Sequence, residues 1–99
     1  MGTVIRTGIT TNTSTILHPN CQPSVFNLKN EGVGSVTVQV FMGTLDILMP
    51  YTPTTTTLSS GQSVQCAVAE PYQTASIVTT NNSGSLTINA SSNGFNGGV

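Results

Sequence analysis

The stretch SVTVQVFMG, residues 35–43, decides the fold of this chain. An apolar side chain stands at every second position, and the side chains of the opposite face stand between them. This period of two is typical of a β-strand with one face on a core, because successive side chains of a strand point to opposite sides. We predict a central strand here, with its core-facing residues at Val36, Val38, Val40 and Met42.

Alternating segments separated by turn residues bring the number of expected strands to about eight. In one of them, residues 44–51, we expect Leu45, Ile47 and Met49 to share a face. Residues 81–84, NNSG, predict a tight hairpin turn between the last two strands, because Asn and Gly tolerate positive φ. The other expected strands are TSTILH (13–18), SVFNLKN (24–30), TTTTL (54–58), SVQCAVAE (63–70), TASIVTT (74–80) and SLTINA (85–90).

Short strands that follow one another at intervals of about 8–12 residues, in a chain with few helix-forming residues, indicate an all-β fold. We expect an antiparallel, eight-stranded, jelly-roll-like sandwich that carries an extended N-terminal arm. We divide the chain into an arm (1–12), a sandwich domain (13–90) and a Gly- and Asn-rich tail (91–99). The tail has only Phe95 and Val99 to bury, so we expect it to be mobile or held against a neighbour.

Charge is scarce in this chain. Its 99 residues include two basic and three acidic ones, and the formal net charge is −1. Charged residues make up roughly a quarter of an ordinary soluble domain. Copies with so little charge repel one another weakly, and a net charge near zero favours association. Two basic residues cannot form the patch that phosphates or anionic lipids require, so we expect neither nucleic acid nor a membrane as partner.

The first residues, MGTVIRTGITTN, are strand-like and lack the basic start and apolar run of a secretory signal. Residues that protect sheet edges are rare in the chain, and an extended segment of one protein can pair with an exposed edge of another. We expect residues 1–12 to be a connector of this kind, with an assembly interface at Val4, Ile5 and Ile9. The alternative is that these residues form the first strand of their own domain or a frayed end.

Cys21 and Cys66 are the two cysteines, one expected in a loop and the other on an inward strand face. Three states are open: two reduced thiols, a disulfide within the chain, or a disulfide between chains. A bridge within the chain would close a loop of about 45 residues and stabilise the fold by roughly 3–4 kcal/mol. The absence of CxxC spacing leaves no metal site to expect.

No arrangement of residues indicates catalysis. His18 is the single histidine, and a pairing with Cys21 would have no third group to orient it. Glu31 and Asp46 would act together only across a cleft. Gly32 to Gly34 read as a turn, because no helix follows to bind a phosphate. We therefore expect no enzyme, no catalytic or metal-binding residues and no cofactor.

Four segments together resemble the pilins of bacterial endospore appendages, the Ena family: GSVTVQVFMG (34–43), TTTTLSSGQSVQCAV (54–68), TASIVTT (74–80) and SLTINA (85–90). The resemblance spans roughly residues 34–90. It implies a jelly-roll core, an N-terminal connector that passes between subunits, disulfides that lock the fibre, and assembly around the spore without export. The connectors of that family carry cysteines, whereas MGTVIRTGIT has none, so Cys21 would be the nearest substitute.

These observations predict a structural subunit that self-assembles by β-strand donation into a fibre or ring on a spore or cell surface. Its partner would be a further copy of itself, with a spore-surface anchor protein as a second partner. The alternative is a carbohydrate-binding or capsid-decorating jelly-roll module. Sugar sites use exposed aromatic rings, and the chain has two Tyr, three Phe and no Trp.

Overall fold

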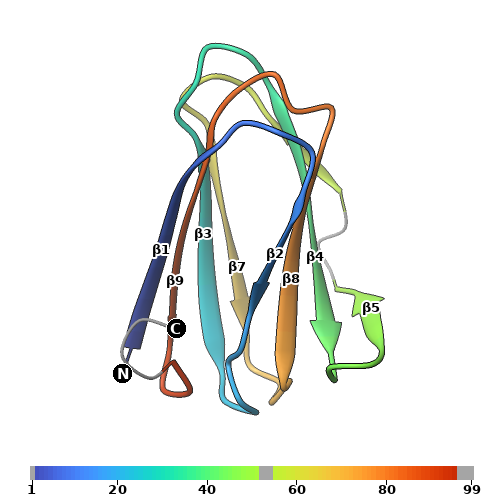
Figure 1. Ribbon diagram of the computed structural model, residues 1–99. Coiled ribbons are helices and arrows are strands. Elements are labelled where there is room, and N and C mark those ends of the chain that lie inside the picture. The colour runs from blue at the N-terminus through green and yellow to red at the C-terminus, as the bar shows by residue number, and fades with distance from the viewer. Residues whose placement is uncertain (1, 52–54, 96–99) are drawn as a thin grey trace.

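The computed structural model describes residues 2–51 and 55–95, which form nine strands and no helix. The strands lie in two sheets packed face to face (Figure 1). Their bounds are β1 Gly2–Ile9, β2 Ser14–Leu17, β3 Ser24–Asn30, β4 Val36–Gly43, β5 Leu48–Pro50, β6 Thr56–Leu58, β7 Ser63–Val68, β8 Thr74–Thr80 and β9 Leu86–Ser92.

Both sheets are antiparallel, and their strand orders define a jelly roll. One sheet has the order β1-β9-β3-β7, and the other has β2-β8-β4, with β5 and β6 both paired to β4. Because β5 and β6 pair with opposite ends of β4, they take the place of one interrupted strand. The nine strands thus fill the eight positions of the double Greek key. The predicted all-β jelly-roll sandwich is confirmed.

The core lies between the inner faces of the two sheets, as the period of two predicts. In β4 the four predicted core residues are at most 4% exposed. The strands β3 and β7 follow the same pattern, with Phe26, Leu28, Cys66 and Val68 buried. Burial of these side chains is the main stabilising contribution, because each removes apolar surface from water.

The predicted hairpin at residues 81–84 is wrong. The strands on either side of it, β8 and β9, belong to different sheets, so this segment crosses from one sheet to the other. The local conformation was predicted well, since Asn81 has a φ of 48°. Turn chemistry determines that the chain reverses here, but it does not determine whether the two strands pair side by side or face each other across the core.

The expected strand that places Leu45, Ile47 and Met49 on one face is also wrong, because Leu45 and Ile47 lie before β5. The three side chains are 64%, 65% and 62% exposed. Residues 44–47 form a turn, in which the Thr44 amide donates to the Ile47 carbonyl at 3.0 Å. Only the last three residues before Tyr51 form a strand. The alternation in this segment therefore extends over a turn, where a period of two has no structural meaning.

The strand β1 is part of the same domain in this structure. It pairs antiparallel with β9, from Gly2 opposite Ser92 to Ile9 opposite Leu86. The register shifts between Arg6 and Ile9, where Gly8 has a φ of +68° and allows a β-bulge. Residues 2–9 thus lie on their own domain, which is the alternative that the sequence left open.

Candidate assembly surfaces

The strand β1 is an edge strand of its sheet and places one fully buried side chain in the core. Val4 is 1% exposed and packs in the core, whereas its neighbour Ile5 is 55% exposed on the outer face. Ile9 is partly buried and packs against the core cluster. Of the three predicted interface residues, only Ile5 lies open on the surface. The other two would reach a neighbour only if β1 left its own domain.

Two polar residues hold the linker between β1 and β2. The Thr79 hydroxyl donates to the Thr11 carbonyl at 2.8 Å and accepts the Thr13 amide at 3.0 Å. The Asn82 side-chain amide donates to the carbonyls of Ile9 and Thr11 at 3.0 and 3.2 Å. These bonds fix the linker across the end of the sandwich where it passes from one sheet to the other. The role of Thr79 and Asn82 was not predicted, because nothing local in the sequence connects them with residues 9–13.

A large hollow lies at the opposite end of the sandwich, beside β5. It has a volume of about 600 Å³, and residues from three loops and from the ends of β4 and β5 line it. Ile47 and Met49, two of the exposed side chains described above, form part of its lining. We name this feature the end hollow. Its other lining residues include Cys21, Met42, Tyr51, Pro71, Tyr72 and Gln73.

Two tyrosines give the end hollow a defined wall. The rings of Tyr51 and Tyr72 meet edge to face, with centroids 6.1 Å apart and planes at 80°. The Tyr51 hydroxyl donates to the Glu70 carboxylate at 3.0 Å. Burial, and then this hydrogen bond, raise the pKa of the Tyr51 phenol above its ordinary value. The phenol is therefore a neutral hydrogen-bond donor whose position is fixed.

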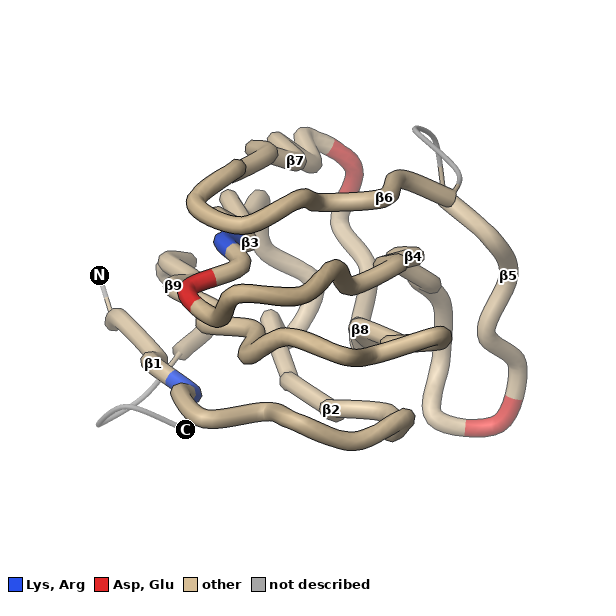
Figure 2. Tube along the Cα trace, turned by 90° about the horizontal axis from the view of Figure 1, so that it is seen from above, with Lys and Arg blue, Asp and Glu red and all other residues tan. Residues whose placement is uncertain are grey.

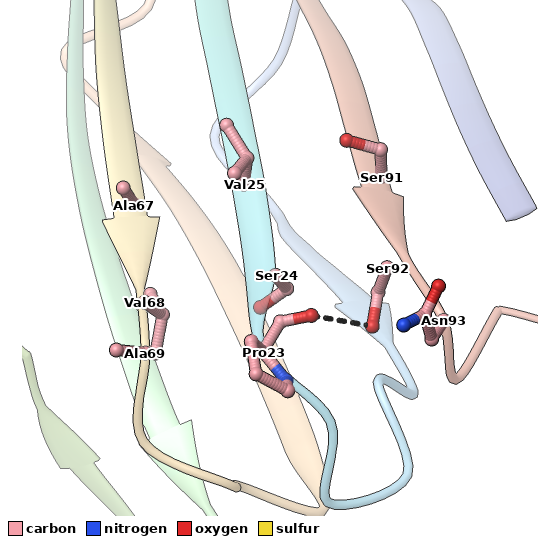
Figure 3. Close-up of a pocket in the computed structure, with 9 residues that line it drawn as sticks. All are labelled: Pro23, Ser24, Val25, Ala67, Val68, Ala69, Ser91, Ser92 and Asn93. Carbon is pink, nitrogen blue, oxygen red and sulfur yellow. Dashed lines mark hydrogen bonds between the residues drawn. The ribbon is translucent and has the colours of Figure 1, made fainter. Parts of the chain in front are cut away.

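A second, shallower hollow of about 370 Å³ lies at the end of the β1-β9-β3-β7 sheet (Figure 3). Its lining side chains are small, including Val25, Ala67 and Ser91. The Ser92 hydroxyl donates to the Pro23 carbonyl at 2.9 Å, whereas the buried Ser24 hydroxyl has no partner among the described residues. The lining of this hollow has no charged side chain.

The two cysteines are free thiols in this structure. Cys21 is exposed in the loop between β2 and β3, where its φ is 63°, and Cys66 is buried on the inner face of β7. Burial raises the pKa of the Cys66 thiol, which keeps it protonated and unreactive. Only Cys21 is placed to meet another molecule.

The charged residues do not gather into a site. Figure 2 marks the acidic residues at three separate places along the chain. The Glu31 carboxylate accepts the Thr87 hydroxyl at 2.8 Å and lies 3.9 Å from the Lys29 ammonium, whereas Asp46 is exposed in the loop between β4 and β5. Within residues 2–51 and 55–95, no three His, Cys, Asp or Glu side chains lie close enough to hold a metal ion.

Asn30 is a structural residue that the sequence did not single out. Its side chain is fully buried and donates to the carbonyls of Gly34 and Leu58, at 2.7 and 3.1 Å. Its oxygen accepts the amides of Gly32 and Ser85, at 3.0 and 3.1 Å. All four hydrogen bonds of the amide are thus made, and they join the β3–β4 loop, the β8–β9 loop and the end of β6 at the end of the sandwich that carries the β1–β2 linker.

Among the described residues there is no helix long and apolar enough to cross a membrane.

No protein-family model matches the chain, and no curated protein matches it. The solved structures similar in fold include the crystal structure of PirA, with a TM-score of 0.51 and 14% identity over 90% of this chain and 93% of the other. They also include a structure of Bacillus endospore appendages, described as disulfide-linked pili. Its TM-score is 0.49, with 16% identity over 89% of this chain and 81% of the other. At these identities the similarity to PirA is one of fold alone.

Proposed function

We propose that this protein is a structural subunit that polymerises into a fibre on a spore or cell surface by exchanging β1 between copies. One observation carries the proposal: β1 is an edge strand with a single fully buried side chain, Val4. Its remaining attachment to the domain is backbone pairing with β9, partial packing of Ile9 and the polar linker contacts. A second copy offers an identical β9 edge, so exchange replaces each of the pairing bonds with an equivalent one.

The geometry of β1 limits how exchanging copies can lie. The linker to β2 is at the same end of the sandwich as the β3–β4 loop (Figure 1). A donated β1 must also run antiparallel to the β9 of its acceptor, with Ile9 opposite Leu86. The linker ends of donor and acceptor therefore have to lie close together. Strand exchange then joins copies side by side, and the scarcity of charge leaves little repulsion between their flanks.

A pair of engineered cysteines tests the exchange directly. Thr3 on β1 lies opposite Ser91 on β9. The native cysteines are first removed by Cys21→Ser and Cys66→Ala, and the pair Thr3→Cys/Ser91→Cys is then introduced. On oxidation, this pair forms a disulfide between chains only if β1 pairs with the β9 of another copy. We expect a ladder of dimers and larger species on a non-reducing denaturing gel. Monomers alone, from protein that nevertheless forms filaments, would contradict strand exchange.

The control pair is Asn27→Cys/Gln65→Cys, which bridges β3 and β7 inside one domain. It should give monomers under the same oxidation. Negative-stain microscopy and light scattering complete the test: the full-length protein should form filaments, and deletion of residues 1–12 should leave monomers or short oligomers. Full-length protein that stays monomeric at high concentration would remove the whole proposal.

A carbohydrate-binding module is the second candidate, and the tyrosine wall of the end hollow favours it. Aromatic faces with a fixed hydroxyl beside them are a common element of ligand sites. A glycan array with the wild type and the Tyr72→Ala variant decides this candidate. Binding that the substitution abolishes would support a sugar site, and the absence of any bound glycan would exclude one for the sugars on the array.

A further inference from the structure

The most exposed of the large apolar side chains in the described residues lies at one end of the molecule. Val33 is 96% exposed at the tip of the β3–β4 loop. It stands between two glycines that pack against the β8–β9 loop, where a Cβ on Gly34 would overlap the backbone of Ser83. The tip is therefore supported from behind by a tightly packed loop, and its valine faces solvent.

The end hollow lies at the other end of the sandwich. The β3–β4 loop is at the top of Figure 1, whereas the loops β2–β3, β4–β5 and β7–β8 are at the bottom. The hollow takes its lining from these three bottom loops and the strand ends beside them. Each copy thus has a projecting apolar tip at one end and an apolar depression at the other.

The charges of the two ends are complementary. Lys29 lies near the end of β3 that leads to Val33. Arg6 on β1 and Leu28 on β3 both pair with Ile88 of β9, so Arg6 lies level with the residue before Lys29. Against these two cations stands one acidic residue, Glu31. Near the end hollow, Glu70 accepts the hydroxyl of its lining residue Tyr51, and Asp46 lies between the lining residues Thr44 and Ile47. The two basic residues, Arg6 and Lys29, are not among the residues that line it. Opposite ends of two copies therefore attract, whereas like ends do not.

From these observations we infer that copies stack head to tail, with the Val33 tip of one copy seated in the end hollow of the next. The inference rests on the proposed polymerisation and adds a second contact to it. A tip and a hollow on different surfaces of one chain form a heterologous contact, and such a contact continues from copy to copy instead of closing into a dimer. The contact between tip and hollow joins copies end to end along the strand direction, whereas strand exchange joins copies side by side.

A second copy fits the end hollow better than a sugar does. No charged residue lines the hollow, and its exposed apolar side chains include Ile47 and Met49. The Tyr51 hydroxyl, which would serve a sugar, already donates to Glu70. An apolar side chain in this space would remove both its own surface and that of the rim from water.

Cys21 lines the end hollow and is exposed, so it can report on the contact. We would mix two proteins of different mass: the Val33→Cys/Cys21→Ser variant and a tagged copy with its native Cys21. If the tip of one copy sits in the hollow of the next, mild oxidation should give a mixed dimer in excess over both homodimers. Peptide mass spectrometry should then find residue 33 joined to residue 21. A statistical mixture of dimers, or no such peptide, would overturn the inference.

The matched control is Ile16→Cys/Cys21→Ser, since Ile16 is an exposed aliphatic residue on β2 that is neither at the β3–β4 tip nor among the residues that line the end hollow. It should form no more mixed dimer than chance gives. A second comparison uses no cysteine: Val33→Ser should shorten filaments at least several-fold, and Ile16→Ser should not. Filaments unchanged by Val33→Ser would overturn the head-to-tail contact and leave strand exchange standing. The opposite result is a disulfide between positions 33 and 21 together with monomers alone from the oxidised Thr3→Cys/Ser91→Cys protein. It would support the head-to-tail contact and contradict strand exchange.

Discussion

At the scale of single residues, the fold depends on a few side chains that join distant segments. Asn30 connects two loops and the end of β6 with four hydrogen bonds, and Thr79 and Asn82 hold the β1–β2 linker. Sequence reasoning identified the apolar residues of the core, because their period of two is a local signal. It passed over these polar residues, since Asn and Thr are common in this chain and their partners are distant in sequence.

The first prediction concerns Asn30. Its replacement by Ala leaves two carbonyls and two amides without their partner, and leaving such groups unsatisfied is costly where water cannot reach them. We expect Asn30→Ala to lower the free energy of unfolding by roughly 2–4 kcal/mol in urea titrations. Asn27→Ala, on the outer face of the same strand, is the control and should change it by less than about 0.5 kcal/mol. Equal effects of the two substitutions would refute the role given to Asn30.

The second prediction concerns Cys66, whose thiol pKa is raised by burial. As the pH rises past the ordinary thiol value, about 8.5, the unfolded chain releases this proton while the folded chain keeps it. The unfolded state then binds fewer protons, so the free energy of unfolding should fall with rising pH until the raised pKa is reached. The stabilisation that is lost in this way is fully present below the ordinary pKa of a thiol.

Urea titrations between pH 7 and 10 in a Cys21→Ser background measure this slope. The additional Cys66→Ala substitution should flatten it. Because the pKa of the Tyr51 phenol is also raised, Tyr51→Phe should remove a further part at the alkaline end. A slope that Cys66→Ala leaves unchanged would show that burial of this thiol is not its cause.

At the scale of elements, the proposed assembly depends on β1. Its two central side chains face opposite ways, with Val4 in the core and Ile5 in solvent. The sequence identified both residues but could not assign β1 to an acceptor. Backbone pairing with β9 is the same whether β1 comes from the same chain or from another one.

The third prediction compares these two neighbours. Val4→Ser removes apolar contacts and places a hydroxyl in the core, so it should destabilise the fold by about 2 kcal/mol or more. Ile5→Ser should have little effect on the stability of the monomer. Hydrogen exchange at β9 amides that face β1 should accelerate in Val4→Ser and stay unchanged in Ile5→Ser. If both variants exchange alike, the anchoring of β1 through Val4 is disproved.

At the scale of the whole molecule, each end has its own character. The β3–β4 end carries the linker, the Asn30 hydrogen bonds and the projecting Val33, and the opposite end carries the end hollow with Cys21. In the proposed fibre, the two dissimilar ends would meet from copy to copy, and β1 would be exchanged at the sheet edge. These surfaces are built mainly from uncharged residues, in keeping with the five charged residues that the chain has.

The fourth prediction concerns Cys21, the exposed thiol. If it crosses chains in the assembled polymer, boiling without reductant should leave covalent oligomers, and boiling with reductant should leave monomers. Cys21→Ser should then give monomers in both cases, whereas Cys66→Ala should behave like the wild type because the Cys66 thiol is buried. Identical gels for Cys21→Ser and wild type would exclude a covalent role for Cys21.

The sequence by itself determined the all-β class, the inward residues of β3, β4 and β7, and the turns at residues 32–34 and 81–84. These follow from local rules: the two-residue period of a strand and the conformations that Gly, Asn and Pro favour. The tertiary structure alone decided that residues 81–84 cross between sheets, that residues 44–47 turn outward, and that β1 lies on its own β9. Almost every residue offers the same backbone N–H and C=O groups, so the local sequence does not specify which strands pair. The pairing depends on how all the strands of the chain pack together.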